Sequence, residues 1–294
     1  MRYWGAALAV AAALSACSAE VEPAPAPAPS SAGAPADDPE ADPDPARAAM
    51  ALVPADATRL AVTDFDRVRL ELGAPLLTGS SGPAEREAFW RRALAEAPLL
   101  STGALRPSDA RLLREYGFAQ DDVAWEASFT GPSGEGWVAG LREGLDLTGV
   151  RRAVADGVGP LAGGVLDEER RVLAVGAAPD EGASWAAEPV LVDLVGGAAM
   201  STYVERGCVS AAEPALDELD ELEAWSVSLG SLLATVRLGA ERGDAFARVR
   251  LAEPPFAEGV ADPVSGRLGY AMTDPALAAR RILARDAPFA ACAP

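Results

Sequence analysis

Hydrophobic and polar residues follow three different patterns along the chain. Residues 4–13 form an unbroken apolar run, and residues 18–46 combine prolines, alanines and acids without any apolar periodicity. From residue 50 to residue 294, apolar positions alternate between the two-residue spacing of strands and the three-to-four-residue spacing of helices. This mixture predicts a single α+β domain, or two lobes sharing one core, with helices packed on an antiparallel or mixed β-sheet.

The same periodicities, together with capping and turn residues, predict individual elements. Asp64 and Ser108 stand where side chains cap helices, and Gly117 stands where a helix ends. We expect helices at residues 64–72, 83–95, 108–117, 194–205 and 275–285. We expect strands at residues 58–63, 125–130, 137–141, 165–175 as a hairpin, 225–229, 232–238 and 246–251.

A weak internal repeat runs through this pattern. Residues 59–64 and residues 267–274 each read as a strand that ends in Asp and leads into a helix, and residues 137–146 give a third copy. The copies suggest repeated strand-helix-hairpin units, although coincidence within a low-diversity composition explains them equally well. We interpret Asp64, Asp146 and Asp274 as helix caps rather than catalytic groups, because a carboxylate there accepts free backbone N–H groups.

The N-terminus carries a targeting signal. The apolar run after Arg2 is shorter than the roughly 20 residues that a membrane-spanning helix needs, so it reads as a signal peptide. It ends in Leu14-Ser15-Ala16-Cys17, which resembles the lipobox of bacterial lipoproteins, here of a GC-rich, actinobacterial type. The resemblance implies cleavage before Cys17, a diacylglycerol on its thiol and a further acyl chain such as palmitate on its amine. The alternative is an ordinary signal peptide followed by an incidental cysteine.

Three regions follow from these observations. Residues 1–16 are the expected signal peptide, residues 17–49 are the lipidated Cys17 with a disordered Pro/Ala/acidic linker, and residues 50–294 are the globular domain. The linker is too poor in apolar residues to bury a core and too proline-rich to form a helix, so it reads as a spacer. The expected location is the outer side of the cell membrane, with the lipid on Cys17 as the membrane contact.

Charge and composition exclude several kinds of chemistry. The formal net charge is −19, which argues against a nucleic-acid partner because such binding needs cationic side chains. The sequence contains neither His nor Lys, so imidazole bases, imidazole metal ligands, Schiff bases and phosphate-binding P-loops are ruled out. No cofactor or metal motif is present, and we predict none. Paired carboxylates remain possible, since they can hydrolyse glycosides without His or Lys.

The other two cysteines and the acidic stretches have structural interpretations. Cys208 and Cys292 are an even pair in an exported protein, which predicts a disulfide, with two buried free thiols as the alternative. Asp121-Asp122 and Asp64-Phe65-Asp66 are expected to face solvent. Residues 213–223 read as an exposed acidic helix with leucines on one face. The strand tryptophans Trp125, Trp137 and Trp225 are expected in the core.

No catalytic residue can be assigned from these patterns. The first functional hypothesis is therefore a non-catalytic binding or assembly module that contacts an envelope protein or glycan. The alternative is a carboxylate-dependent hydrolase acting on cell-envelope glycan, and sequence alone cannot choose a pair of acids for it.

Overall fold

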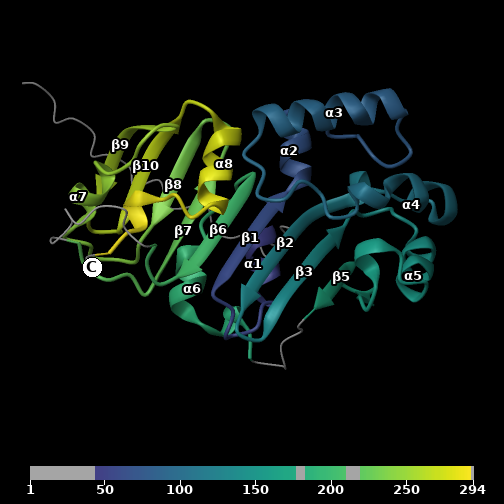
Figure 1. The fold of residues 1–294 in the computed structure, drawn as a ribbon, viewed down its shortest axis with the longest axis horizontal. Helices are drawn as coiled ribbons and strands as arrows, with labels where there is room; N and C mark the ends of the chain where they lie inside the picture. Colours follow the sequence, from purple (N-terminus) through teal and green to yellow (C-terminus); the bar gives the residue numbers. More distant parts are fainter. Residues whose placement is uncertain (1–43, 177–182, 210–218, 293–294) are drawn as a thin grey trace, which may run out of the picture. The chain divides into compact units, whose positions relative to one another are not determined.

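Ten strands form one antiparallel sheet in a computed structural model of the chain, which describes residues 44–176, 183–209 and 219–292. Their order is β4-β5-β3-β2-β1-β6-β7-β8-β10-β9 (Figure 1). The central pair, β1 with β6, joins residues 59–63 to residues 201–205 and so connects an N-terminal half of the sheet to a C-terminal half. The described residues therefore confirm an α+β architecture.

Most neighbouring strands are also neighbours in the sequence. Strands β2 and β3, β4 and β5, β7 and β8, and β9 and β10 are antiparallel pairs of consecutive strands. The strands are β1 (Arg59–Asp64), β2 (Val123–Gly131), β3 (Gly134–Leu141), β4 (Val165–Asp167), β5 (Val172–Gly176), β6 (Ser201–Arg206), β7 (Ala224–Leu229), β8 (Leu233–Arg237), β9 (Phe256–Asp262) and β10 (Arg267–Met272).

Helices cover both faces of the sheet. They are α1 (Pro45–Met50), α2 (Phe65–Glu71), α3 (Pro83–Glu96), α4 (Asp109–Tyr116), α5 (Leu147–Ala155), α6 (Pro189–Leu194), α7 (Ala245–Val249) and α8 (Pro275–Leu283). On one face, α1 and α6 pack with Leu60 and Val62 of β1 in a single apolar cluster. On the other face, one cluster gathers residues of α2 to α5, and another gathers residues of α8 around Trp225.

Local sequence signals that act within a few residues are confirmed. Asp64 accepts a hydrogen bond from Arg67 N at 2.9 Å, Asp146 from Thr148 N at 3.0 Å, and Asp274 from Leu277 N at 2.8 Å, so each caps a helix as expected. Burial raises the pKa of Asp64 to about 6. Of the three helices capped in this way, only α5 is followed by a hairpin, β4–β5, so the structure does not confirm repeated strand-helix-hairpin units.

Two elements were predicted wrongly. The helix expected at 194–205 is replaced by the end of α6 and by β6, whose side chains are buried on both faces and therefore lack an alternating polar pattern. The strand expected at 246–251 is largely α7, in which Arg248 pairs with Asp244 one turn earlier. A central strand without alternation and a five-residue helix both give weak periodic signals.

The acidic stretch and the domain boundary also differ from expectation. Residues 219–223 are not helical, and Leu219 and Leu222 are buried, so this described part of 213–223 is not an exposed helix. Helix α1 begins beyond the capping residue Asp44 and buries Ala46 and Ala49, so the folded unit includes residues assigned above to the linker. The expected signal peptide, Cys17 and most of the linker lie outside the described residues.

Candidate functional site: a groove beside helix α3

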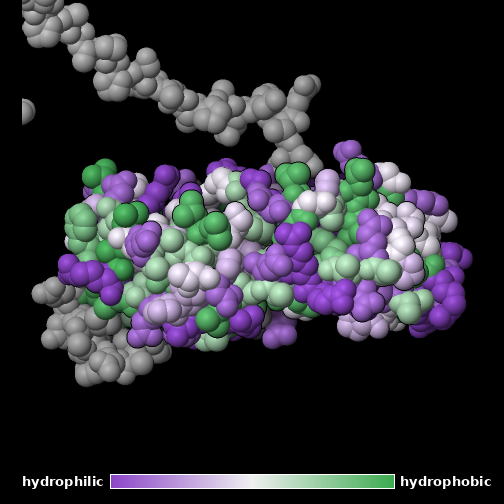
Figure 2. Space-filling view, turned by 90° about the horizontal axis from the view of Figure 1, so that it is seen from above, coloured by the Kyte–Doolittle hydropathy of each residue, from purple (hydrophilic) through white to green (hydrophobic). Residues whose placement is uncertain are grey.

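A groove of about 980 Å³ lies between α3, the segment 102–107 and α4. Its apolar lining includes Leu94 of α3 and Leu113 of α4, and Arg91 and Arg106 also line it. Elsewhere on the surface seen from above, hydrophobic residues are interspersed with hydrophilic ones (Figure 2). Surface hydrophobicity on that face therefore does not by itself mark a binding site, and the groove is the better candidate.

Trp90 forms one wall of the groove and is fixed from three sides. Its ring makes edge contacts with Phe65 and Phe89, with centroid distances of 5.5 and 5.3 Å. Its Nε1 donates a hydrogen bond to Asp121 at 2.8 Å. The guanidinium of Arg106 lies 4.5 Å from the ring centroid and makes a cation–π contact with the indole.

A buried ionic cluster supports this wall. Arg86 of α3 forms ion pairs with Asp121 and with Asp109, the latter at 3.0 Å. Burial raises the pKa of Asp109, although hydrogen bonding from Gln120 N and the charge of Arg86 oppose the shift. Breaking such a buried pair by removing one partner leaves an uncompensated charge, so α3 and α4 are held in a fixed relation.

The expectation that Asp121 and Asp122 face solvent is wrong. Both are buried, and Asp122 accepts hydrogen bonds from Gly79 N and Ala119 N, each at 2.9 Å. Apart from Ala119, the hydrogen-bond partners of these two acids come from segments more than 30 residues away, which the local sequence does not reveal.

The segment 100–104, which forms part of the groove, is held on the sheet by two buried side chains. Thr63 of β1 and Glu126 of β2 are direct cross-strand partners. Thr63 Oγ1 accepts hydrogen bonds from the backbone N–H groups of Leu100 and Ser101, at 3.1 and 2.9 Å.

Glu126 completes this attachment. One carboxylate oxygen accepts from Ser101 Oγ at 2.6 Å, and the other accepts from Ala104 N and Trp137 Nε1, each at 2.8 Å. Burial raises the pKa of Glu126, and these three hydrogen bonds oppose that shift. Glu126 therefore serves as an anchor for a loop, with each of its oxygens already engaged.

Positive charge collects at the groove even though the protein is strongly acidic. Within the ranges that the structure describes, Arg91 and Arg106 form no ion pair, while Glu87 and Asp109 are the acids in the lining. Asp109 is already neutralised by Arg86. The arrangement suits a ligand that combines apolar and acidic groups.

Five buried acids have structural roles. Asp121, Asp122, Glu126, Glu205 and Asp244 are buried, and each accepts hydrogen bonds from other side chains or from the backbone. In the described part of the chain, no group of three or more Asp, Glu, Cys or His is placed to hold a metal ion. No helix there is long and apolar enough to cross a membrane.

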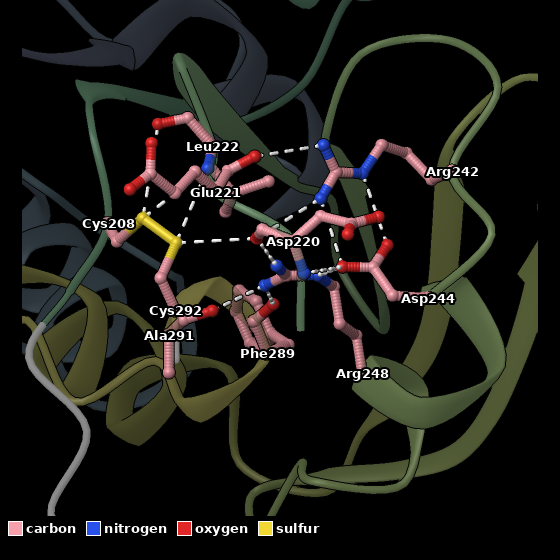
Figure 3. Close-up of a disulfide and its surroundings, with 10 residues drawn as sticks. All are labelled: Cys208, Asp220, Glu221, Leu222, Arg242, Asp244, Arg248, Phe289, Ala291 and Cys292. Atoms are coloured by element: carbon pink, nitrogen blue, oxygen red, sulfur yellow. Dashed lines mark hydrogen bonds and ion pairs between the residues drawn. A yellow bond between two sulfur atoms is a disulfide. The ribbon is translucent and has the colours of Figure 1, made fainter. Parts of the chain in front are cut away.

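The predicted disulfide between Cys208 and Cys292 is confirmed, with a Cα–Cα distance of 5.7 Å. It attaches the C-terminal residues to the segment that follows β6 (Figure 3). Leu222 N lies 3.4 Å from the sulfur of Cys208 and 3.3 Å from that of Cys292, so segment 219–223 contacts the same bond.

Beside the disulfide, Arg248 joins three parts of the chain (Figure 3). Its buried guanidinium donates to Asp244 Oδ2 at 2.6 Å, to the carbonyl oxygens of Phe289 and Ala291, and to that of Asp220. Burial favours a higher pKa for Asp244, but hydrogen bonds from Arg242 and Arg248 outweigh it and lower the pKa. This cluster is structural and lies in the C-terminal half of the sheet.

The sequence placed some site residues correctly and missed others. Trp225 is buried as expected, and Trp125 and Trp137 pack against apolar clusters. Arg86, Arg106 and Glu126 were missed because their partners are distant in sequence. Comparison with protein-family models, curated proteins and solved structures finds no match to this chain.

Removing the disulfide should destabilise the folded unit. The bond closes a loop of 84 residues, for which chain entropy gives roughly 4–5 kcal/mol. We expect the double variant Cys208→Ser/Cys292→Ser to lose stability of that order in urea unfolding monitored by tryptophan fluorescence. Cys17→Ser, which leaves the bond intact, is the control. Full labelling of both Cys208 and Cys292 in unreduced, unfolded protein would contradict the bond.

Proposed function

We propose that the protein is a lipoprotein anchored on the outer side of the cell membrane, whose folded unit binds a partner in the cell envelope. Residues 1–16 would be the signal peptide, and Cys17 would carry the diacylglyceryl and palmitoyl-type chains. The lipobox-like residues 14–17 support this assignment. The Cys208–Cys292 disulfide is the structural observation that carries it, because such bonds persist in oxidising, extracytoplasmic compartments.

The groove beside α3 supports the binding role. Its tryptophan wall, its apolar lining and two arginines that form no ion pair with any described acid favour an extended peptide with apolar and acidic side chains, presented by another envelope protein. Pre-formed walls reduce the ordering cost of binding, which is why we favour this groove over a flat surface.

The alternative function is a carboxylate-dependent glycan hydrolase. One observation favours it: Asp109 lines the groove with a raised pKa, as a general acid would, and Glu87 lines the same groove. Against it, Asp109 already pairs with Arg86 and accepts a hydrogen bond from Gln120 N. We therefore propose binding without hydrolysis as the primary function.

We further propose that the three strand-Asp-helix segments, β1–α2, β3–α5 and β10–α8, descend from one repeated unit. Their shared use of an Asp cap at the start of the helix supports the idea.

Lipidation is tested by intact-mass analysis of protein extracted from membranes of a bacterial host. We expect the mature chain to begin at Cys17 and to carry a diacylglyceryl group with an amide-linked acyl chain. Cys17→Ala should abolish both the added mass and the membrane association, whereas Cys208→Ala should affect neither. Recovery of a soluble chain with an unmodified Cys17 would contradict the anchor.

The groove is tested by co-sedimentation with a cell-envelope fraction that contains both proteins and wall glycan. Leu94→Glu places a charge in the groove and should lower the bound fraction about tenfold or more. Leu283→Glu is the matched control, since Leu283 on α8 has 45% of its surface exposed against 39% for Leu94. Release of reducing ends that disappears in Asp109→Asn would instead favour the hydrolase.

A further inference from the structure

Arg237 of β8 has an unusual environment. Its neighbours Val236 and Leu238 point into the core beside Trp225, so Arg237 projects from the opposite face of the sheet. On that face the loop after α6 passes over it. A Cβ atom built at Gly196 would overlap Nη1, Nη2 and Cζ of Arg237, which places the guanidinium directly against the Gly196 backbone.

This guanidinium is held by packing rather than by pairing. Nη1 is buried without a hydrogen-bond partner among the residues that the structure describes, and no described carboxylate forms an ion pair with Arg237. Burial and the charge of Arg267 both lower its pKa. A buried, unsatisfied cationic donor is costly, so it calls for an explanation.

A second arginine stands directly across from it. Arg267 of β10 is the cross-strand partner of Arg237, and like charges in this position destabilise a sheet. Asp262 faces Arg267 from β9, but its oxygens accept from Ser265 and Val264, and the described contacts include no ion pair between Asp262 and Arg267. Hydrogen bonds from Ser265 and, to a smaller extent, the charge of Arg267 lower the pKa of Asp262, so Asp262 partly compensates Arg267. No described carboxylate forms an ion pair with Arg237.

Other donors without described partners lie on this face of the sheet and in the loop after α6. Ser228 of β7 lies on the same face as Arg237, and its buried Oγ also lacks a described partner. The backbone N–H groups of residues 196–199 donate to no described acceptor. Guanidinium, hydroxyl and consecutive amide groups are the donors that proteins use to bind oxyanions.

Apolar residues continue from this position along the open sheet face. Leu233 of β8 and Val260 of β9 are each 67% exposed. Leu233 pairs with Ala271, and Gly269 of β10 lies between Thr235 and Val260. An anion bound at Arg237 would thus have apolar side chains on the same face of the sheet, with Val260 packed over Gly269.

We propose that Arg237 and Arg267 bind the oxyanion head, a phosphate or a carboxylate, of a single-chain amphiphile whose aliphatic part lies on Leu233 and Val260. The head group replaces the missing counter-charge, and the aliphatic chain covers an exposed apolar strip. This site is on the other face of the sheet from the α3 groove and does not depend on the function proposed for that groove.

Isothermal titration calorimetry on the full chain carrying Cys17→Ala tests the proposal, with octyl phosphate, octanoate and inorganic phosphate as probes. We expect one of the two octyl compounds to bind about tenfold or more tightly than inorganic phosphate, because only they occupy the apolar strip. The octyl compound that binds identifies the head group.

Two variants locate the binding. Arg237→Gln removes the charge, and Gly196→Ala displaces the guanidinium without changing charge; each should weaken binding about tenfold or more. Arg280→Gln on α8, an exposed arginine of the other face, is the matched control and should bind normally. Circular dichroism melting checks that each variant is folded. The proposal would be overturned if neither octyl compound binds. It would also be overturned if binding is unchanged in folded Arg237→Gln and Gly196→Ala. Equal binding of octyl phosphate and inorganic phosphate would overturn the role of the apolar strip.

Discussion

Two buried polar side chains at the centre of the sheet, Thr63 and Glu126, determine where the chain between β1 and β2 can lie. They are cross-strand partners, and together they accept four hydrogen bonds from residues 100–104, three of them from backbone N–H groups. Backbone donors over an apolar sheet would otherwise be buried without partners, at a cost of about 1–3 kcal/mol each. Because α3 precedes this segment and α4 follows it, holding the segment also restrains these two helices. The segment and the two helices form the groove.

In the C-terminal half of the sheet, a buried polar side chain again holds irregular segments by hydrogen bonds. There a buried cation rather than a carboxylate makes the contacts, since Arg248 donates to carbonyl oxygens of residues 220, 289 and 291. The disulfide joins the same segments covalently. Buried charged side chains thus supply these irregular segments with hydrogen bonds that the backbone supplies in helices and strands. A large number of acids in the sequence therefore does not by itself indicate an active site.

The sequence predicted those features whose cause is local. The caps Asp64, Asp146 and Asp274 act on N–H groups two or three residues away, and the β7–β8 hairpin has its turn residues between its strands. Strand β6 was missed because burial on both faces removes the alternation that identifies a strand. The groove was missed because Trp90, Arg86 and Asp121 meet only after folding, across 31 to 35 residues. The disulfide was predictable because, once Cys17 is assigned to the lipobox-like motif, Cys208 and Cys292 are the two cysteines that remain.

Amide hydrogen exchange measures directly how Glu126 anchors residues 100–104. In Glu126→Ala, the amide of Ala104 should exchange about tenfold or more faster than in the parent protein, because it loses its acceptor. The amide of Gly103, which donates to Ser101 Oγ, should also exchange faster once that hydroxyl is released from Glu126. Glu126→Gln retains a carbonyl oxygen for Ala104 and Trp137 and should preserve most of the protection. Glu135→Ala, at an exposed acid of β3, should change nothing in this segment. Unchanged exchange of residues 101–104 in folded Glu126→Ala would show that Glu126 does not anchor this segment.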